Sequence, residues 1–367
     1  MIVAIDVTTL RGRISGVGYY TARIVEHVAE SIGKEVSELL LFSNLPVDRP
    51  LPAGARLVTG FSFPIRSVWM QFLLPLALRK ARPDIVHYTN YLAPAISAGD
   101  YVVSVHDMSL TRTPEHHTLK KRVLTASLAP RVARRARLVL TPSRATSQDV
   151  MNDLLIPKER VLTIPYAAAE MFQPTAERPR HRGTNRPYFL FVGTIEPRKN
   201  LMRLIDAFAA FARDIPDVHL VLAGQRGWKC DEIYARAARP DVKDRTFILD
   251  YVDEASLPSL YSHALACVYP SLFEGFGFPV VEAMACGTPV LTSNTTSLGE
   301  IGEGAALLVD PLDTGSITSG LLRLGTSERV REELREKGLK RAASFSWRET
   351  GRRTLAAYRK ALGLLDS

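Results

Sequence analysis

The sequence predicts an α/β protein built from two tandem doubly wound, Rossmann-like domains that face each other across a cleft. Short apolar runs rich in β-branched residues alternate with helical segments, which is typical of parallel sheets covered on both faces. The runs form two sets, and a polar, proline-rich stretch separates them. With 367 residues, the chain is long enough for two domains that each bury a core.

Seven apolar runs are expected to form the parallel strands of an N-terminal domain, residues 1–172. Parallel neighbours need crossover connections, so right-handed βαβ units are expected between them. In chain order the runs cover 2–7, 38–44, 55–60, 84–90, 101–107, 138–143 and 161–167.

A linker and a second domain follow. The stretch "QPTAERPRHRGTNRP", residues 173–187, has little to bury and is expected to link the domains. The second domain, 188–345, holds six further runs, and the last segment, 346–367, is expected to be a helix that packs locally or crosses to the first domain. The six runs cover 188–194, 218–224, 246–250, 266–271, 289–294 and 306–310.

Composition narrows the class of protein and its partners. The net charge of +9 fits anionic partners, whether nucleic acid, lipid headgroups or phosphorylated small molecules. Three scattered cysteines without a CxxC pair indicate reduced thiols. The sequence shows neither the pattern of a signal peptide nor an apolar run of the roughly 20 residues that span a bilayer. A cytoplasmic protein is therefore expected.

A basic turn, "EPRKN", follows the first strand of the second domain and precedes the amphipathic helix 201–212. Arg198 and Lys199 therefore lie at a strand end and beside a helix N-terminus, where cations and unpaired N–H groups favour an anion. An arginine fork and a mobile lysine charge suit a diphosphate. The alternative is a solvated turn with surface charges.

A glycine-containing turn follows the first strand of the chain. Gly16 and Gly18 stand before a helix, and glycine lets a backbone approach a phosphate closely. Thr21 stands where a G-x-G-x-x-G fingerprint would have its third glycine, and the acidic residue that a dinucleotide ribose needs is missing. A plain tight turn explains these glycines equally well.

His106 and Asp107 end a buried strand of the first domain. A histidine in that place can contact a polar ligand or move a proton, and a hydrogen-bonded structural histidine is an equal alternative. The chain holds no HExxH, CxxC or Asp-x-Asp motif, so the sequence predicts no dedicated metal site.

The stretch "FEGFGFPVVEAMACGTPV", residues 273–290, places two glutamates on either side of a glycine turn. Gly277 frees the loop backbone and Pro279 suits the first turn of a helix. Glu274 then projects from the loop, and Glu282 lies about one turn inside the helix. Because a carboxylate has two acceptor oxygens, such a pair can bind hydroxyls on two sugars of one ligand. Alternatively, Glu282 makes only helix-surface contacts.

These motifs together resemble the retaining glycosyltransferases of the GT-B fold, specifically family GT4. Its hallmark is the E-x7-E spacing that Glu274 and Glu282 show. "SGVGYYT", "VHDMSLTRTPEHH" and "FSWRET" resemble further segments of that family, so the resemblance covers essentially the whole chain. The combination of "VGTIEPRKNL", "AGQRGW" and "HD" looks most like bacterial mannosyltransferases of O-antigen and exopolysaccharide synthesis.

The resemblance implies a role for each matching residue. Arg198 and Lys199 would neutralise the donor diphosphate, and Glu274 would hydrogen-bond the donor sugar. The last helix would cross back onto the first, acceptor-side domain. Further expected contacts are Glu282 with the ribose, Gly16 and Gly18 near the diphosphate, the backbone N–H groups of Phe276, Gly277 and Phe278 beside sugar and phosphates, His106 near the sugar C6 hydroxyl, and Tyr251 and Val252 beside the base.

The implied reaction is transfer of a hexose from a nucleotide diphosphate sugar, with retention at the anomeric carbon and without a metal or other cofactor. Mannose from GDP-mannose is the expected donor, and a glycan or lipid-linked glycan is the expected acceptor. A UDP-sugar-dependent glucosyltransferase of the same family is the nearest alternative.

Three other classes of protein fit the sequence less well. An NAD(P)-dependent oxidoreductase also suits tandem parallel sheets, but the third glycine and the ribose acid are missing. A sugar-nucleotide 2-epimerase shares the architecture and would need its own acid–base carboxylates and histidine. A nucleic-acid binder would use the positive charge, but Glu274 and Glu282 would repel phosphates, so no nucleic-acid partner is expected.

Two segments are candidates for contact with a membrane surface. Residues 116–138 combine an apolar stripe with lysines and arginines, and residues 68–78 form an apolar, aromatic-containing run. Both suit peripheral docking on anionic lipid at the inner face of the cell membrane. A solvated helix with one buried stripe is the alternative.

Overall fold

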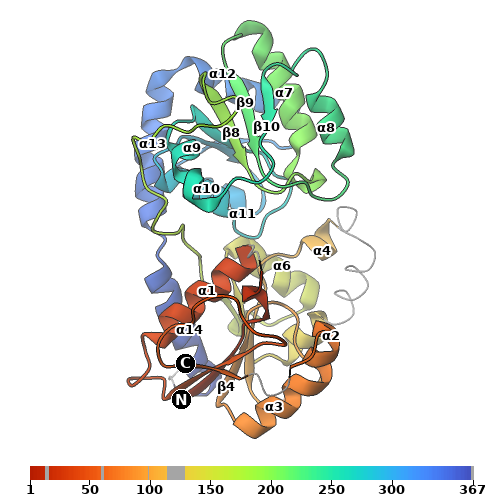
Figure 1. Cartoon of the computed structure of the whole chain (residues 1–367), viewed down its shortest axis with the longest axis vertical. Helices are drawn as coiled ribbons and strands as arrows, with labels where there is room; N and C mark the ends of the chain where they lie inside the picture. The colour runs from red at the N-terminus through yellow and green to blue at the C-terminus, as the bar shows by residue number, and fades with distance from the viewer. Residues whose placement is uncertain (13–15, 59–61, 98, 114–128, 365–367) are drawn as a thin grey trace. The chain divides into compact units, whose positions relative to one another are not determined.

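The computed structural model describes residues 1–12, 16–58, 62–97, 99–113 and 129–364. Contacts divide the chain into two compact units (Figure 1). Unit 1 comprises Met1–Tyr166 together with the C-terminal segment from Ser346, and unit 2 comprises Ala167–Phe345.

Unit 1 is built on a seven-stranded sheet in the order β3-β2-β1-β4-β5-β6-β7, and every neighbouring pair is parallel. The chain order reverses between β1 and β4, so these two strands flank the topological switch point of the sheet. The strands are β1 (Ile2–Asp6), β2 (Glu38–Phe42), β3 (Ala55–Val58), β4 (Ile85–Tyr88), β5 (Tyr101–Ser104), β6 (Leu138–Thr141) and β7 (Val161–Thr163).

The helices of unit 1 include one from the far end of the chain. α14 (Trp347–Ala361) packs on α1 (Gly16–Ala29), as Figure 1 shows. A Cβ at Gly351 would lie 2.4 Å from the Cβ of His27, so glycine permits this close approach. The Tyr358 hydroxyl also lies 2.7 Å from His87 Nδ1 on β4. The other helical elements include η1 (Thr8–Leu10), α2 (Arg66–Val68), η2 (Trp69–Leu73), α3 (Leu74–Ala81), α4 (Ser109–Arg112), α6 (Arg144–Leu154) and η4 (Lys158–Arg160).

Unit 2 is built on a six-stranded sheet in the order β10-β9-β8-β11-β12-β13, again parallel throughout. Its switch point lies between β8 and β11. Strands buried on both faces explain the continuous apolar runs that predicted them. The strands are β8 (Tyr188–Val192), β9 (His219–Ala223), β10 (Thr246–Ile248), β11 (Ala266–Tyr269), β12 (Val290–Ser293) and β13 (Leu307–Val309).

The helices of unit 2 form two contacting groups. α7 (Leu201–Asp214) contacts α8 (Asp231–Ala237) and α12 (Thr314–Thr326). α10 (Phe278–Ala285) contacts α9, α11 and α13. Right-handed crossovers on either side of a switch point place one such group on each face of the sheet. The remaining bounds are α9 (Leu257–Ser262), α11 (Thr296–Gly302), α13 (Glu328–Ala343), η5 (Pro197–Lys199) and η6 (Glu254–Ser256).

The predicted fold class is confirmed, because each of the expected runs forms a strand of one of two parallel sheets. The segment 173–187, expected to be a linker, differs from that expectation. The contacts divide the chain after Tyr166, and the segment packs within unit 2: Thr175 N donates to Ser262 Oγ at 3.2 Å, and the Gly183 carbonyl lies 2.9 Å from His219 Nδ1. Backbone hydrogen bonds anchor a stretch that has few apolar side chains.

All three cysteines are free and buried, as expected. Within the described residues, no helix is both long and apolar enough to cross a membrane. Within the basic segment 116–138, residues 116–128 lie outside the described residues.

Candidate active site

The turn after β8 carries Arg198 and Lys199, and its neighbours hold its shape. Ile195 pairs with Arg226, and its N–H donates to the Gln225 carbonyl at 3.0 Å, so the turn runs beside the chain that leaves β9. Asn200 adopts φ 62° between η5 and α7, and its Nδ2 donates to the carbonyls of Pro270 and Pro311 at 3.0 and 2.6 Å. These contacts fix both cations at the carboxyl end of β8.

The loop after β11 carries Glu274 and leads into α10. Leu272 N donates to the Arg198 carbonyl at 2.9 Å, which joins this loop to the turn after β8. Gly277 precedes α10 with φ 103°, and a Cβ there would lie 2.6 Å from Leu298 Cδ2. Only glycine suits both the left-handed backbone and this close contact. The predicted glycine turn, Pro279 in the first helical turn and α10 itself are thus all present.

Arg198, Lys199 and Glu274 form one buried charge cluster. Lys199 Nζ lies 2.6 Å from Glu274 Oε1, and Arg198 Nη1 lies 3.0 Å from Glu274 Oε2. Ser271 and Tyr269 also donate hydroxyl hydrogen bonds to Glu274 Oε1, at 2.7 and 3.2 Å. The structure therefore brings together three of the four side chains that the sequence predicts to bind the donor; the fourth is Glu282.

The cluster sets the charge of Glu274. Burial alone would raise the pKa of this carboxyl, but Arg198, Lys199 and the hydrogen bonds together lower its pKa to about 2. Glu274 is only 9% exposed, and charges interact strongly where water is excluded. The side chain is thus a carboxylate throughout the physiological pH range.

The cluster lies at the carboxyl ends of β8 and β11, which flank the switch point of the second sheet. Open α/β sheets bind ligands outside the carboxyl ends of such strands. The N-terminus of α10 opens from the same loop, with Phe276, Gly277 and Phe278 at its start. Helix N-termini favour anions. The site therefore combines cations, a carboxylate and a helix N-terminus.

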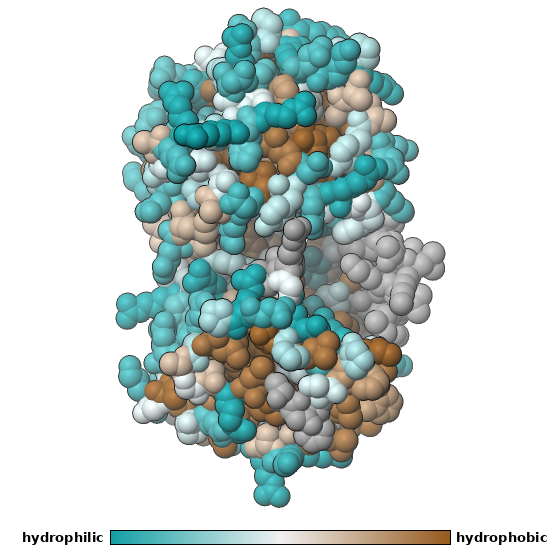
Figure 2. Space-filling model, viewed as in Figure 1, coloured by the Kyte–Doolittle hydropathy of each residue, from teal (hydrophilic) through white to brown (hydrophobic). Residues whose placement is uncertain are grey.

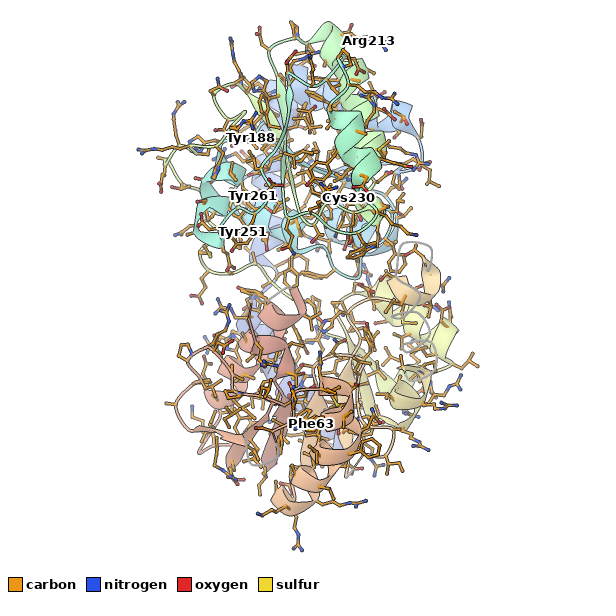
Figure 3. The ribbon with its side chains drawn as sticks, turned by 45° about the vertical axis from the view of Figure 1, so that its right-hand side comes forward. Phe63, Tyr188, Arg213, Cys230, Tyr251 and Tyr261 are labelled. Atoms are coloured by element: carbon orange, nitrogen blue, oxygen red, sulfur yellow. The ribbon has the colours of Figure 1, made fainter. Side chains whose placement is uncertain are left out.

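Glu282 lies apart from this cluster, one turn inside α10. Its Oε2 accepts a hydrogen bond from the Tyr261 hydroxyl at 3.0 Å. Burial raises the pKa of Glu282 to about 7, and the charge of Glu254 adds to this effect. Tyr251, after β10, is 57% exposed, while Tyr261 is buried (Figure 3).

Three predicted site residues, Gly16, Gly18 and His106, belong to unit 1, whereas the charge cluster belongs to unit 2. His106 follows β5, and both of its ring nitrogens have protein partners: Nε2 donates to the Thr89 carbonyl at 2.7 Å, and Nδ1 accepts from the Tyr166 hydroxyl at 2.8 Å. Gly16 and Gly18 lie inside the first turn of α1 and not in a turn before it. The buried face of α1 explains this correction, because tertiary packing overrides the low helix propensity of glycine.

The sequence did not single out the partners of the cluster. Glu196 accepts from Arg198 Nη2 at 2.6 Å, and Lys199 Nζ donates to the Tyr269 hydroxyl at 2.6 Å. Glu196 lies in the turn after β8, and Tyr269 is the last residue of β11, so their places beside expected strand ends were the available signal. Among the described residues, no group of three or more histidines, cysteines and carboxylates is arranged to hold a metal ion.

Comparison with known proteins places this geometry in a family. Residues 14–167 match the profile of Glycosyltransferase Family 4, and residues 173–341 match that of Glycosyl transferases group 1. The chain is 30% identical to O-antigen chain mannosyltransferase B of Escherichia coli, over 94% of this chain and 96% of the relative. It is 27% identical to O-antigen chain mannosyltransferase RfbU of Salmonella typhimurium, over 69% of each chain.

Solved structures share the fold. Sucrose-phosphate synthase from Thermosynechococcus elongatus superposes with a TM-score of 0.78 at 20% identity, covering 99% of both chains. WaaG, a glycosyltransferase involved in lipopolysaccharide biosynthesis, superposes with a TM-score of 0.74 at 16% identity, covering 97% of this chain and 99% of that one. With two parallel sheets and a full-length mannosyltransferase relative, the chain belongs to glycosyltransferase family 4 and has the GT-B fold.

Proposed function

We propose that this glycosyltransferase is a retaining hexosyltransferase that transfers mannose from GDP-mannose to a glycan or lipid-linked glycan. The observation that carries the proposal is the cluster of Arg198, Lys199 and Glu274 at the switch point of the second sheet. The relatives named as O-antigen mannosyltransferases favour mannose as the sugar.

The two cations would hold the diphosphate of the donor. A lysine ammonium has three N–H donors, and Tyr269 and Glu274 accept two of those of Lys199. The guanidinium of Arg198 is oriented by Glu196 and by the Phe273 carbonyl. The site therefore needs little reorganisation to bind phosphate oxygens, which is what preorganised electrostatic stabilisation requires.

Catalysis would follow from charge that develops on the leaving group. As the bond between the anomeric carbon and the phosphate oxygen breaks, negative charge grows on the diphosphate, and fixed cations bind that charge more tightly in the transition state than in the ground state. The acceptor hydroxyl attacks the same face of the sugar and gives its proton to the leaving phosphate. The protein supplies no nucleophile in this scheme, and no metal is required.

The remaining predicted contacts keep the roles assigned from the sequence. Glu282 would accept from the ribose hydroxyls, and Glu274 from hydroxyls of the transferred sugar. Tyr251 and Val252 would flank the base, and the backbone at Phe276–Phe278 would approach the sugar and phosphates. Gly16, Gly18 and His106 would contact the donor from unit 1.

A thermal-shift screen with GDP, UDP, ADP and dTDP tests the donor assignment. A nucleotide at 100 times its Kd stabilises the folded state by about 2.7 kcal/mol. We expect GDP to give the largest shift, and GDP-mannose to give a product whose anomeric configuration is retained. If UDP gives the largest shift in melting temperature, the UDP-sugar-dependent glucosyltransferase would replace the GDP-mannose enzyme as the favoured hypothesis. No shift with any of the four would remove the nucleotide-sugar function.

We also propose that unit 1 contacts an anionic membrane surface. Ile65, Val68, Phe72 and Leu76 are exposed, and their spacing places Phe72 and Leu76 one helical turn apart. Phe72 is 68% exposed. Apolar residues gather over the region where α2 and α3 lie (Figure 2). Arg79 and Lys80, in the last turn of α3, add positive charge beside this face. An apolar face bordered by cations suits anionic lipid.

Flotation with vesicles tests this contact. The protein should float with phosphatidylglycerol-containing vesicles at low salt and not with neutral phosphatidylcholine vesicles. Phe72→Ser with Leu76→Ser should abolish flotation without lowering the melting temperature, because both side chains are already exposed. Equal flotation of this variant and the wild type would show that another surface binds lipid, and absence of wild-type flotation would remove the proposal.

A further inference from the structure

Two aromatic rings from neighbouring strands stack beside the charge cluster in unit 2. Phe191 of β8 and Tyr269, the last residue of β11, have ring centroids 5.4 Å apart and an interplanar angle of 9°. Both side chains are buried, and Tyr269 is only 1% exposed. Stacking and burial account for an aromatic ring at position 269, and a phenylalanine would provide both. The hydroxyl of Tyr269 therefore needs a separate explanation.

The Tyr269 hydroxyl joins a cation of the cluster to its carboxylate. Lys199 Nζ donates to this oxygen at 2.6 Å, and the hydroxyl lies 3.2 Å from Glu274 Oε1. An ammonium group can only donate, so the Tyr269 oxygen accepts from Lys199 and its single proton points to Glu274. Burial raises the pKa of Tyr269, which keeps that proton on the hydroxyl. The hydrogen bonds therefore run in one direction, from Lys199 through Tyr269 to Glu274.

Lys199 depends on fixed partners more than Arg198 does. A lysine carries its charge at the end of a flexible four-carbon stem, whereas a guanidinium is a rigid, planar fork. The two terminal nitrogens of Arg198 are held by Glu274 and Glu196, at 3.0 and 2.6 Å. Lys199 Nζ donates to Tyr269 and to Glu274, both at 2.6 Å. Because an ammonium is tetrahedral, two such bonds set the direction of its third N–H.

Tyr269 is itself held in place, so it can fix a flexible neighbour. Its backbone pairs in register with Thr292 of β12, and the Thr292 hydroxyl donates to the Tyr269 carbonyl at 2.9 Å. Its ring is packed against Phe191 of β8. Functional side chains are positioned most precisely by residues that are locked by packing on rigid elements. Tyr269 meets this description, since it lies on a central strand between β8 and β12.

We propose that Tyr269 is a positioning residue for the transfer reaction, whose hydroxyl fixes the ammonium of Lys199 so that its remaining N–H faces the diphosphate of the donor. The inference rests on the proposed function, because it presupposes that Lys199 binds the diphosphate. Tyr269 itself does not touch the donor in this account, and it acts only through Lys199 and Glu274.

Tyr269→Phe removes the hydroxyl and keeps the ring. Glu274 still has Lys199, Arg198 and the Ser271 hydroxyl as partners, so the variant should fold. Tyr188→Phe is the matched control. Tyr188, labelled in Figure 3, is buried on β8, and its hydroxyl donates to the Leu260 carbonyl at 2.7 Å.

The control differs from Tyr269 in its place in the sheet. Tyr188 is the first residue of β8, at the amino end of the strand, whereas the charge cluster lies at the carboxyl end. Both variants thus remove one buried, hydrogen-bonded hydroxyl from the same sheet, and only one of them changes the cluster.

Isothermal titration of the full chain with GDP and with guanosine tests the proposal, and UDP and uridine serve if the screen selects uracil. The wild type should bind GDP more tightly than guanosine. Tyr269→Phe should reduce this preference by about three- to tenfold through weaker binding of GDP alone, because a hydrogen bond to a charged group is lost where the diphosphate binds. Tyr188→Phe should keep the wild-type preference.

Melting without ligand separates this role from a purely structural one. Both variants should melt below the wild type, by about 2–4 °C, because each loses a buried hydrogen bond. A residue that only stabilises the fold would change stability and leave the ratio of the two affinities as it is. A similar stability loss with an unequal change in diphosphate preference would therefore support the positioning role.

Three results would overturn the proposal. The first is an unchanged preference for GDP in Tyr269→Phe, and the second is an equal weakening of GDP and guanosine in that variant. The third is an equal fall of the preference in Tyr188→Phe. In each case a wild type that prefers GDP leaves the proposed function standing. A wild type without that preference would reject the diphosphate role of Lys199 and this inference together.

Discussion

Asp6 in unit 1 and Glu274 in unit 2 are two buried carboxyls near the switch points of their sheets, and their surroundings differ. Glu274 has Lys199 at 2.6 Å and Arg198 at 3.0 Å, and its pKa falls to about 2. Asp6 has Arg66 at 3.9 Å, and its pKa rises. Burial raises the pKa of a carboxyl in either place, so the distance and number of cations decide the net direction.

The comparison teaches that the negative charge of Glu274 is compensated within unit 2, whereas that of Asp6 is only partly compensated within unit 1. The cluster in unit 2 pairs both carboxylate oxygens of Glu274 with cations, so it holds those cations in place before a ligand arrives. Asp6 has a hydrogen bond from the Thr8 N–H and a single cation at 3.9 Å, so its charge is compensated less completely than that of Glu274. Substitution of Glu274 should therefore lower stability, whereas substitution of Asp6 should leave stability level or raise it.

The largest expected effect is that of Glu274→Gln. Removing one partner of a buried ion pair leaves unpaired charge, which costs about 3–5 kcal/mol. We expect a fall in the free energy of unfolding of this size at pH 7, measured by urea denaturation, together with loss of transfer activity. Asp6→Asn is the matched variant, and its stability should stay level or rise, since it removes a poorly compensated charge. An equal loss of unfolding free energy in both variants would contradict the proposed difference between the two carboxyls.

The acid side of the stability profile should depend on Glu274. Its folded-state pKa lies below its unfolded-state value of about 4.5, so its contribution is complete above that value and is lost as the pH falls towards 2. A shift of this size amounts to about 3 kcal/mol. Urea denaturation at pH 5.5 and 2.5 should show this loss in the wild type, and a smaller one in Glu274→Gln. Parallel profiles would contradict the ion-pair assignment.

Glu282 should act in the opposite direction. Its pKa is raised to about 7, so the folded state binds a proton more tightly than the unfolded state. Stability should be greatest below pH 4.5 and fall as the pH rises to about 7, by at most about 3 kcal/mol. Glu282→Gln should flatten this part of the profile and weaken binding of a nucleoside that has a ribose. An unchanged slope between pH 5 and 8 would show that Glu282 is not the group that titrates.

The smallest expected effect concerns a pair that is satisfied within unit 1. Tyr358 on α14 lies 2.7 Å from His87 on β4, and burial lowers the pKa of His87 to about 3, so this histidine stays neutral. Tyr358→Phe should cost about 1 kcal/mol, the usual contribution of one hydrogen bond. Calorimetry should detect it as a lower melting temperature. Absence of any shift would indicate that α14 is held by packing alone.

The sequence predicted the sheets because buried parallel strands are apolar without interruption, as in Phe189–Phe191 and Val102–Val103. It also predicted cations after β8 and a carboxylate after β11. It could not predict that Lys199 and Glu274 would be in contact, because that contact depends on β8 lying beside β11. The periodicity of a single segment does not determine the order of strands in a sheet.

Other features could not be predicted from the sequence, because they also depend on tertiary packing. The approach of Arg66 to Asp6 joins two stretches of chain that only the tertiary fold brings together, so it leaves no local sequence pattern. Gly16 and Gly18 were expected before a helix, because glycine favours turns. Burial of Tyr20 and Ile24 instead extends α1 through both glycines. The helix boundary was thus decided by packing and not by propensity.

The central claim is that Arg198 and Lys199 hold the diphosphate of the donor. Isothermal titration of GDP and of guanosine, with wild type and Arg198→Gln, tests it most directly, and UDP and uridine serve if the screen selects uracil. We predict that Arg198→Gln removes most of the preference for the diphosphate over the nucleoside and leaves nucleoside affinity unchanged. The same preference in both proteins would contradict the account.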